Sequence, residues 1–215
     1  MAHAIKSAAL LGIAALAATA IATPGFAATT EIREVASNNL YSGNARATLI
    51  QNLVISGGGN TTCTASTLSG TVDSDGNPLS IASATITGCS GTASAVTAQG
   101  LPWSSGTVVY SPVVSGRDGV VNLNGFSVRA TVLGVNCTYG ANIAANGFNG
   151  GNANRPVSTN SQAQVNLAGI TIPRTAGIFL CPSSATITQG AYQLTGETSP
   201  GSGVFTNSLY ITGTP

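Results

Sequence analysis

Apolar and polar side chains alternate along short segments of this chain, as they do in β-strands with one covered face. Residues 126–132 carry apolar side chains at every even position, which predicts a strand with one apolar face. Residues 49–55 are apolar on both parities, so that strand is predicted to be covered on both faces. Residues 108–114 alternate as well, and Pro112 assigns them to a sheet edge because proline cannot donate a ladder hydrogen bond. Helical periodicity is almost absent beyond residue 27.

The dipeptide Asn124-Gly125 lies directly between two apolar segments. Asn-Gly is the strongest short signal for a hairpin, because both residues accept the positive φ that a tight turn requires. The pattern therefore predicts a hairpin that joins residues 120–123 to residues 126–132.

The whole pattern predicts an all-β fold. The apolar positions change parity within residues 79–86, and a β-bulge near Ala82-Ser83 accounts for the change. Roughly ten to twelve short strands can be counted, at the spacing that is typical of an all-β sandwich or barrel. We therefore expect an antiparallel β-sandwich or barrel-like domain.

The first 27 residues have the composition of a secretory signal. Lys6 marks the charged start, residues 8–22 are apolar, and residues 23–27 are a small-residue cleavage stretch with the best cut after Ala27. No later apolar run reaches the roughly 20 residues that a membrane-spanning helix needs. The chain is therefore predicted to be exported, and then secreted or held at the cell surface without a transmembrane anchor.

Beyond the signal, the sequence suggests one domain with two irregular segments. Residues 28–44 are predicted to be an N-terminal arm, because residues 31–41 concentrate charges there. Residues 45–215 are predicted to form a single β-rich domain, since no linker divides them into two complete cores. Residues 140–161 are rich in asparagine and glycine and are predicted to be a long polar loop, of the kind that is usually functional or mobile.

The charged residues exclude several classes of function. The chain has seven basic and six acidic residues, and its single histidine and single lysine both fall in the predicted signal. Catalysis by a Ser-His or Cys-His pair, imidazole metal sites and lysine Schiff bases are therefore excluded for the exported part. A few scattered arginines and a net charge of zero after the signal argue against nucleic-acid binding.

Four cysteines follow the signal, namely Cys63, Cys89, Cys137 and Cys181. An even number of cysteines in an exported chain indicates disulfides, and the absence of any C-x-x-C spacing argues against a zinc site or a redox motif. Three pairings are open, and sequence alone does not decide among them. We favour Cys63 with Cys89 and Cys137 with Cys181, because each of these pairs brackets a similar stretch.

Trp103 is the one tryptophan of the chain and the candidate binding residue. As an exposed aromatic it would contact a sugar, a hydrocarbon or a partner. The alternative is a side chain packed on the sheet, with its indole N–H hydrogen-bonded.

The acidic residues give no catalytic or metal-binding pattern. A glycosidase needs two carboxylates opposed across a cleft, whereas Glu31 and Glu34 fall in the predicted arm and Asp73 and Asp75 in a predicted turn. Residues 73–77 resemble the start of a calcium loop, but the glutamate at its twelfth position is missing, so a turn is predicted. We expect no cofactor and no metal.

The order of several motifs resembles a group of small exported bacterial proteins. These motifs are Cys63 to Gly70, residues 84–89 (Ala-Thr-Ile-Thr-Gly-Cys), residues 100–103 (Gly-Leu-Pro-Trp), the second cysteine pair and a threonine-rich C-terminal strand. They are similar to the PraA/PraB type, often labelled activators of alkane oxidation. The resemblance covers about residues 45–212. It implies an exported β-protein of the bacterial surface or matrix, linked to growth on hydrocarbons and to biofilm or adhesion, and it offers no catalytic motif.

Three functions remain open from the sequence. The first is a non-enzymatic surface or matrix protein that mediates contact with hydrophobic surfaces, with cells or with its own copies, and that supports alkane use indirectly. The second is a self-assembling fibre subunit that donates residues 31–41 or 205–211 to the next copy. The third is a carbohydrate-binding module or carboxylate-dependent hydrolase, which would need a cleft lined by Trp103 or tyrosines.

Overall fold

A computed structural model describes residues 28–114 and 116–214, so the predicted signal, residues 1–27, lies outside the described residues. The described residues form twelve β-strands, in agreement with the predicted number and class, and none of them belongs to a helix long and apolar enough to cross a membrane. The strands are β1 (Thr29–Glu34), β2 (Gly43–Ser56), β3 (Asn60–Val72), β4 (Leu79–Gly91), β5 (Ala93–Ala98), β6 (Trp103–Tyr110), β7 (Gly119–Val132), β8 (Val135–Phe148), β9 (Ala163–Asn166), β10 (Thr171–Ala176), β11 (Ser184–Gly196) and β12 (Asn207–Thr214).

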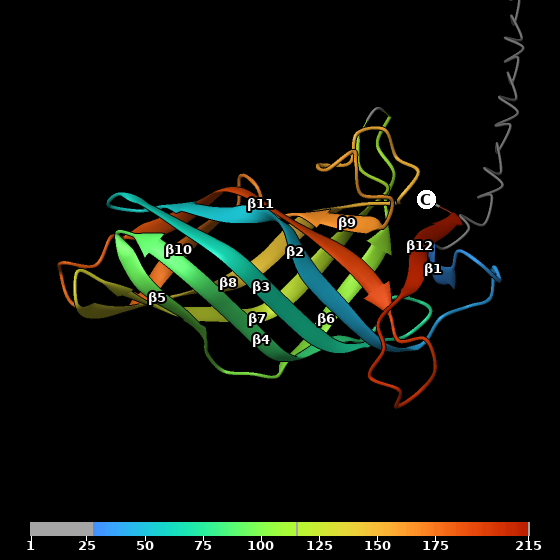
Figure 1. Cartoon of the computed structure of the whole chain (residues 1–215), viewed down its shortest axis with the longest axis horizontal. Coiled ribbons are helices and arrows are strands. Elements are labelled where there is room, and N and C mark those ends of the chain that lie inside the picture. Colours follow the sequence, from blue (N-terminus) through green and yellow to red (C-terminus); the bar gives the residue numbers. More distant parts are fainter. Residues whose placement is uncertain (1–27, 115, 215) are drawn as a thin grey trace, which may run out of the picture.

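The strands close into an antiparallel barrel (Figure 1). Strands β2, β3 and β4 pair in succession, β7 pairs with β8, and β11 pairs with β2 to complete the cylinder. Two of the eight positions around the barrel are shared by two short strands each. Strands β6 and β5 lie one after the other along β7, and β9 and β10 lie one after the other between β8 and β11. Of the two predicted architectures, the barrel is therefore the one that forms.

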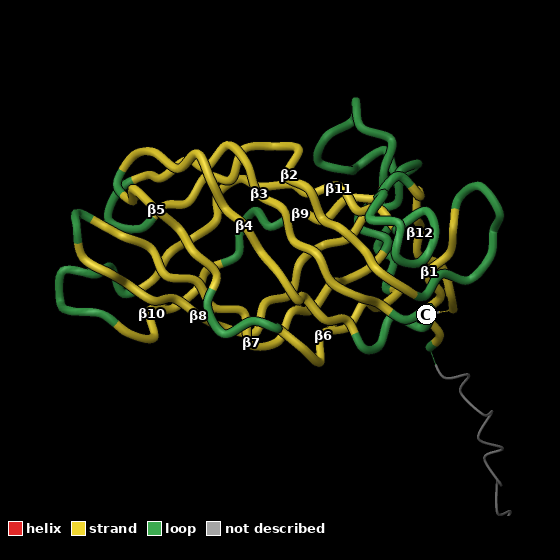
Figure 2. Tube along the Cα trace, turned by 60° about the horizontal axis from the view of Figure 1, so that its bottom comes forward, coloured by secondary structure: helices red, strands yellow, loops and turns green. Residues whose placement is uncertain are grey.

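Strands β1 and β12 form a two-stranded ribbon at one end of the barrel, on the right in Figure 1. The start of β12 also pairs with the end of β11, which joins the ribbon to the barrel. Ile32 of β1 and Leu209 of β12 are buried there. Asn149, just after β8, fixes the ribbon by accepting a hydrogen bond from the Ile211 N–H (2.8 Å) and donating one to its carbonyl (2.9 Å). The longer loops gather at this same end (Figure 2). We refer to it as the ribbon end.

The ribbon corrects the predicted N-terminal arm, residues 28–44. Its first residues are the paired strand β1, Tyr41 is buried, and β2 begins at Gly43, just before the predicted domain boundary at residue 45. The partner of this segment is the last strand of the chain, and a pairing between the two ends of the chain leaves no local signal.

The predicted long loop, residues 140–161, is also corrected. Strand β8 continues to Phe148, so the first part of the stretch belongs to the barrel. The loop itself, residues 149–162, is tied down by its side chains. Arg155 donates to three backbone carbonyls at 2.6–2.8 Å, and the fully buried Gln164 bonds the loop backbone as both donor and acceptor.

The predicted hairpin at Asn124-Gly125 is a bulge within the continuous strand β7. The register of β7 against β8 shifts between Leu123 and Phe126, and Gly125 has a φ of 71°. The Gly125 N–H donates to Asn142 Oδ1 at 2.9 Å. A long strand must bend to follow the barrel wall, and a bulge with a positive-φ glycine provides that bend. The same dipeptide that closes a hairpin therefore curves a strand here.

Other local predictions can be compared directly with the strands. The bulge near Ala82 is confirmed, because the register of β3 against β4 skips this residue. The strand at residues 126–132 is confirmed, and its apolar positions face the interior. The strand expected at residues 108–114 stops at Tyr110, and Val114 is 97% exposed.

Both favoured disulfides are confirmed. Cys63 and Cys89 stand directly opposite each other on β3 and β4, with a Cα–Cα distance of 3.9 Å. The Cys137–Cys181 bridge, with a Cα–Cα distance of 5.6 Å, ties β8 to the loop between β10 and β11. In the chain-entropy model such bridges stabilise the folded chain by about 3.5 and 4 kcal/mol. Structural disulfides of this kind are typical of exported proteins.

Glu197 organises the long loop between β11 and β12. Its carboxylate accepts hydrogen bonds from Asn44 Nδ2 (2.8 Å), from the Gly203 N–H (2.5 Å) and from the Gly201 N–H (3.1 Å). These donors, Asn44 first, lower the pKa of Glu197 below its ordinary value of 4.5, although partial burial opposes the effect. The loop is therefore held in place by an ionised carboxylate.

This lowered pKa predicts a loss of stability in acid. A carboxyl group with a lowered folded pKa stabilises the protein at pH values above its unfolded pKa, and this stabilisation is lost as the pH falls through the folded pKa. We expect Glu197→Gln to be less stable than the wild type at neutral pH. The difference between the two should shrink as the pH is lowered below about 4.5, which urea unfolding at a series of pH values can measure. A difference that stays constant with pH would contradict this role for Glu197.

Candidate functional site: an apolar cavity inside the barrel

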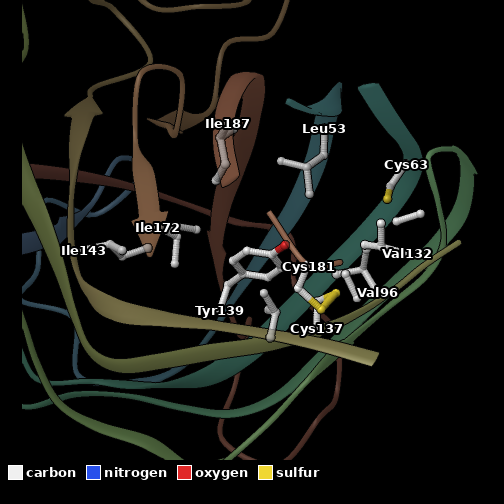
Figure 3. Close-up of a cluster of buried hydrophobic side chains, with 13 residues drawn as sticks. Leu53, Cys63, Val96, Val132, Cys137, Tyr139, Ile143, Ile172, Cys181 and Ile187 are labelled. Carbon is white, nitrogen blue, oxygen red and sulfur yellow. A yellow bond between two sulfur atoms is a disulfide. The ribbon is translucent and has the colours of Figure 1, made fainter. Parts of the chain in front are cut away.

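The barrel encloses an internal cavity of about 210 Å³. Figure 3 shows part of the surrounding core, where side chains from β2, β8, β10 and β11 point toward one interior space beside the Cys137–Cys181 bridge. An engineered cavity of about 150 Å³ with an aliphatic and aromatic lining stays dry and binds benzene. The cavity of this barrel is thus large enough to hold a small apolar molecule.

The cavity extends along the barrel between two clusters of buried side chains. One cluster lies toward the disulfides and includes Leu53, Val128 and Tyr139. The other lies toward the ribbon and includes Trp103 and Leu209. Residues of both clusters line the same cavity, so its long dimension follows the barrel axis.

Small residues at inward positions account for the empty space. An eight-stranded barrel is just wide enough for its side chains to fill the interior, or for the interior to hold one small ligand. Here alanines stand at inward positions on four different strands, where larger side chains would fill the gap: Ala84, Ala93, Ala130 and Ala185. The strand pattern thus gives an interior that is apolar but incompletely filled.

Trp103 lies at the ribbon side of the cavity. It is only 2% exposed, and its Nε1–H donates to the Gln99 carbonyl at 2.8 Å. Its ring centroid lies 4.7 Å from that of Phe126, with the rings tilted by 51°. The exposed aromatic contact considered from the sequence is therefore wrong, and the hydrogen-bonded, packed alternative is confirmed. The indole lines the cavity, so a ligand that reaches the ribbon side of the cavity contacts it.

Ser66 is the polar group that stands out in the lining. It is 5% exposed, and its hydroxyl has no hydrogen-bond partner among the described residues. The phenol of Tyr192 is its neighbour, but the two hydroxyls do not reach hydrogen-bond geometry. A buried hydroxyl without a partner is costly, so Ser66 is available to bond a polar atom of a ligand.

Burial keeps two tyrosines of the lining, Tyr139 and Tyr192, neutral at ordinary pH. Burial raises the pKa of Tyr192. Burial also raises the pKa of Tyr139, against the opposing positive charge of Arg174. Neither phenol is therefore a source of negative charge inside the barrel.

Charged groups are kept out of the interior. Arg46 is the single charged residue among the described residues that line the cavity, and its guanidinium lies 3.9 Å from the centre of the Phe205 ring in the β11–β12 loop. A cation held over an aromatic face is already partnered. The Arg46 Nε is nevertheless buried without a hydrogen-bond partner among the described residues, so Arg46 is the one place in the lining where a ligand could meet a charged donor.

None of the acidic residues lines the cavity, and the carboxylates of all but Asp73 are engaged in structural contacts. Glu31 forms an ion pair with Arg33 at 2.8 Å, and Asp118 accepts hydrogen bonds from Asn149 and Asn152 at 2.7 and 2.8 Å. Asp75 Oδ1 accepts from the Asn77 N–H at 2.9 Å, which confirms the predicted turn. Among the described residues, no cluster of three or more histidine, cysteine, aspartate or glutamate side chains is placed to hold a metal ion.

From the sequence, Trp103 was considered as an exposed binding residue, whereas it is buried, and Ser66 was not considered at all. A serine in a threonine- and serine-rich strand carries no signal of its own, and its position in the interior follows only from barrel closure. Alanines at the inward parity of the strands are the one feature of the sequence that hints at a cavity. Comparison with protein-family models, with curated proteins and with solved structures finds no match for the chain. Its function must therefore be argued from the cavity itself.

Proposed function

We propose that this chain is a non-enzymatic binding protein that holds a neutral, apolar molecule inside its barrel. The observation that carries the proposal is the elongated cavity of about 210 Å³, lined almost entirely by aliphatic and aromatic side chains. Concave, mostly apolar pockets with a few polar groups are the usual form of small-molecule sites.

The chemistry of the lining narrows the class of ligand. Away from Arg46, a charged group would enter without a counter-charge, at a large cost in desolvation. A sugar would bring many hydroxyls, whereas Ser66 is the unpartnered side-chain hydroxyl of the interior. A linear hydrocarbon chain with at most one neutral polar group fits both the shape and the polarity.

This proposal is compatible with the functions expected from the sequence. An exported protein that contacts hydrophobic material and supports alkane use indirectly would have a use for a hydrocarbon-sized cavity. Its roles in adhesion and biofilm, and its place at the bacterial surface, stay predictions. The fibre alternative also stays a prediction. It now requires the β1–β12 pairing to open, because both segments considered for donation are paired with each other.

Trp103 provides a direct test of ligand entry. We expect 1-bromooctane to quench the fluorescence of Trp103 in a saturable titration, because bromine quenches on close approach and this indole lines the cavity. The variant Ala130→Leu fills inward space and should weaken binding by about ten-fold or more, since the added carbons displace ligand methylenes.

Ala95→Leu is the matched control for that experiment. Ala95 is exposed on β5 and pairs with Thr131, next to Ala130, so it receives the same substitution on the outer face. Quenching that does not saturate, or that is unchanged in Ala130→Leu, would contradict binding in the cavity. Loss of binding in both variants would contradict it as well.

Ser66→Ala separates an anchoring role from a structural one. Removal of a buried, unpartnered hydroxyl should raise the free energy of unfolding of the unliganded protein by about 1 kcal/mol. The same change should weaken binding of octan-1-ol while leaving binding of n-octane unchanged. Chemical unfolding and displacement of 1-bromooctane measure the two effects. Ser94→Ala, which removes an exposed hydroxyl on β5, should alter neither. A destabilised Ser66→Ala that binds both ligands equally weakly would contradict the anchoring role.

A further inference from the structure

Four large apolar side chains are exposed at the end of the barrel opposite the ribbon, on the left in Figure 1. Leu133 lies in the turn between β7 and β8 and is 82% exposed. Ile178, Phe179 and Leu180 lie in the loop between β10 and β11, where Phe179 is 89% exposed. We call these four residues the apolar tip.

The two loops of the tip are held close to the barrel by specific contacts. The Cys137–Cys181 bridge joins the β10–β11 loop to β8, a few residues from Leu133. Gly177 packs so closely that a Cβ there would lie 2.6 Å from Cys181 Sγ. Arg174 donates through Nη1 to the carbonyls of Ile178 (2.9 Å) and Cys181. The apolar side chains are therefore presented on a braced loop.

The acidic residues of the described part of the chain are confined to one end of the barrel, where four of the six arginines also lie. All six acidic residues lie at the ribbon end, in β1, in the β3–β4 turn, before β7 and after β11. The half that carries the tip has two arginines, Arg129 and Arg174, and no acidic residue. The tip is thus flanked by positive charge alone.

We propose that the apolar tip docks the protein onto a lipid surface that contains anionic headgroups. The tip side chains enter the boundary between headgroups and acyl chains, while Arg129 and Arg174 lie at the level of the phosphates. Apolar residues flanked by basic ones are the pattern with which proteins bind anionic membrane surfaces. The acidic ribbon end points away from that surface.

The charges favour a lipid surface over a second copy of the chain. A symmetric contact between two tips would bring four arginines together without an acidic partner, and like charges at an interface oppose association. The tip also projects from the end of the barrel on a loop and a turn, which suits insertion into a deformable surface. This inference goes beyond the proposed ligand binding and does not depend on it.

The first test is sedimentation of the full exported chain with lipid vesicles. We expect binding to vesicles of phosphatidylcholine mixed with phosphatidylglycerol, and much weaker binding to phosphatidylcholine alone or at high salt. The double variant F179S/L180S should bind the mixed vesicles about ten-fold less or weaker still. Arg129→Gln should reduce binding to the mixed vesicles and also its salt dependence.

The matched control is V113S/V114S, which removes two exposed valines from the β6–β7 loop at the ribbon end. It should bind the mixed vesicles as the wild type does. Circular dichroism and thermal unfolding should show that each of these variants is folded. Phe179 and Val114 are almost fully exposed, and Leu180 and Val113 are about half exposed, so no buried side chain is altered. Equal loss of binding in F179S/L180S and V113S/V114S would overturn the assignment to the tip.

A second measurement tests insertion itself. Phe179→Trp places an indole at the tip, whereas the wild-type Trp103 is shielded in the barrel. Lipids with brominated acyl chains should quench the added fluorescence of Phe179→Trp and leave wild-type fluorescence almost unchanged.

No binding of the wild type to any vesicle would overturn the proposal. So would self-association in the absence of lipid that is lost in F179S/L180S. Ala130→Leu should keep vesicle binding while losing the ligand, so failures of the two proposals are distinguishable.

Discussion

The pairing of β11 with β2 is the contact on which the rest of this structure depends. It turns a linear series of antiparallel strands into a closed cylinder, so the inward side chains of all the barrel strands share one interior. Closure also removes the free edges of those strands, through which β-proteins tend to associate. The outer edge of β1 is largely occupied as well, because the Ile32 N–H donates to the Ser74 carbonyl (2.7 Å) and the Ile32 carbonyl accepts from the Tyr41 N–H (2.9 Å). The strand also carries Glu31, Arg33 and Glu34, charges of the kind that discourage edge-to-edge pairing. The fold therefore gives little support to unspecific strand addition.

Closure also gives the molecule two unlike ends. The ribbon end carries the long loops, the β1–β12 pair and all of the acidic groups of the described residues. At the other end the turns are short, a disulfide braces the β10–β11 loop, and apolar side chains stand among arginines. The described residues carry six arginines and six acidic residues and so have no net charge, yet the half with the tip holds two arginines and no acidic residue. The cavity lies inside the barrel, whereas the apolar tip lies on loops at one end, so ligand binding and surface docking can be tested separately.

The sequence predicted the local elements better than their partners. The alternation of apolar and polar residues identified the strand at residues 126–132 and the bulge at Ala82, because both depend only on which side chains must be buried in the interior. It failed at Asn124-Gly125, since the same backbone preference serves a hairpin or a bend, and only the length of the neighbouring strand decides between them. The arm at residues 28–44 failed for a different reason, because its partner strand lies at the far end of the chain. The site was even less accessible, since Ser66 and the inward alanines acquire meaning only once the barrel has closed.

The empty interior requires stabilisation from elsewhere in the structure. At about 24 cal/mol per Å³, a cavity of 210 Å³ costs about 5 kcal/mol relative to a filled core. Two disulfides that close loops of 26 and 44 residues contribute about 7 to 8 kcal/mol together in the chain-entropy model. The cross-links are thus of the size needed to offset the cavity, with a few kcal/mol to spare. Selection for stability alone would fill such a space by replacing the inward alanines with larger apolar side chains. A cavity kept open in a cross-linked barrel is therefore a physical argument that the space itself is used.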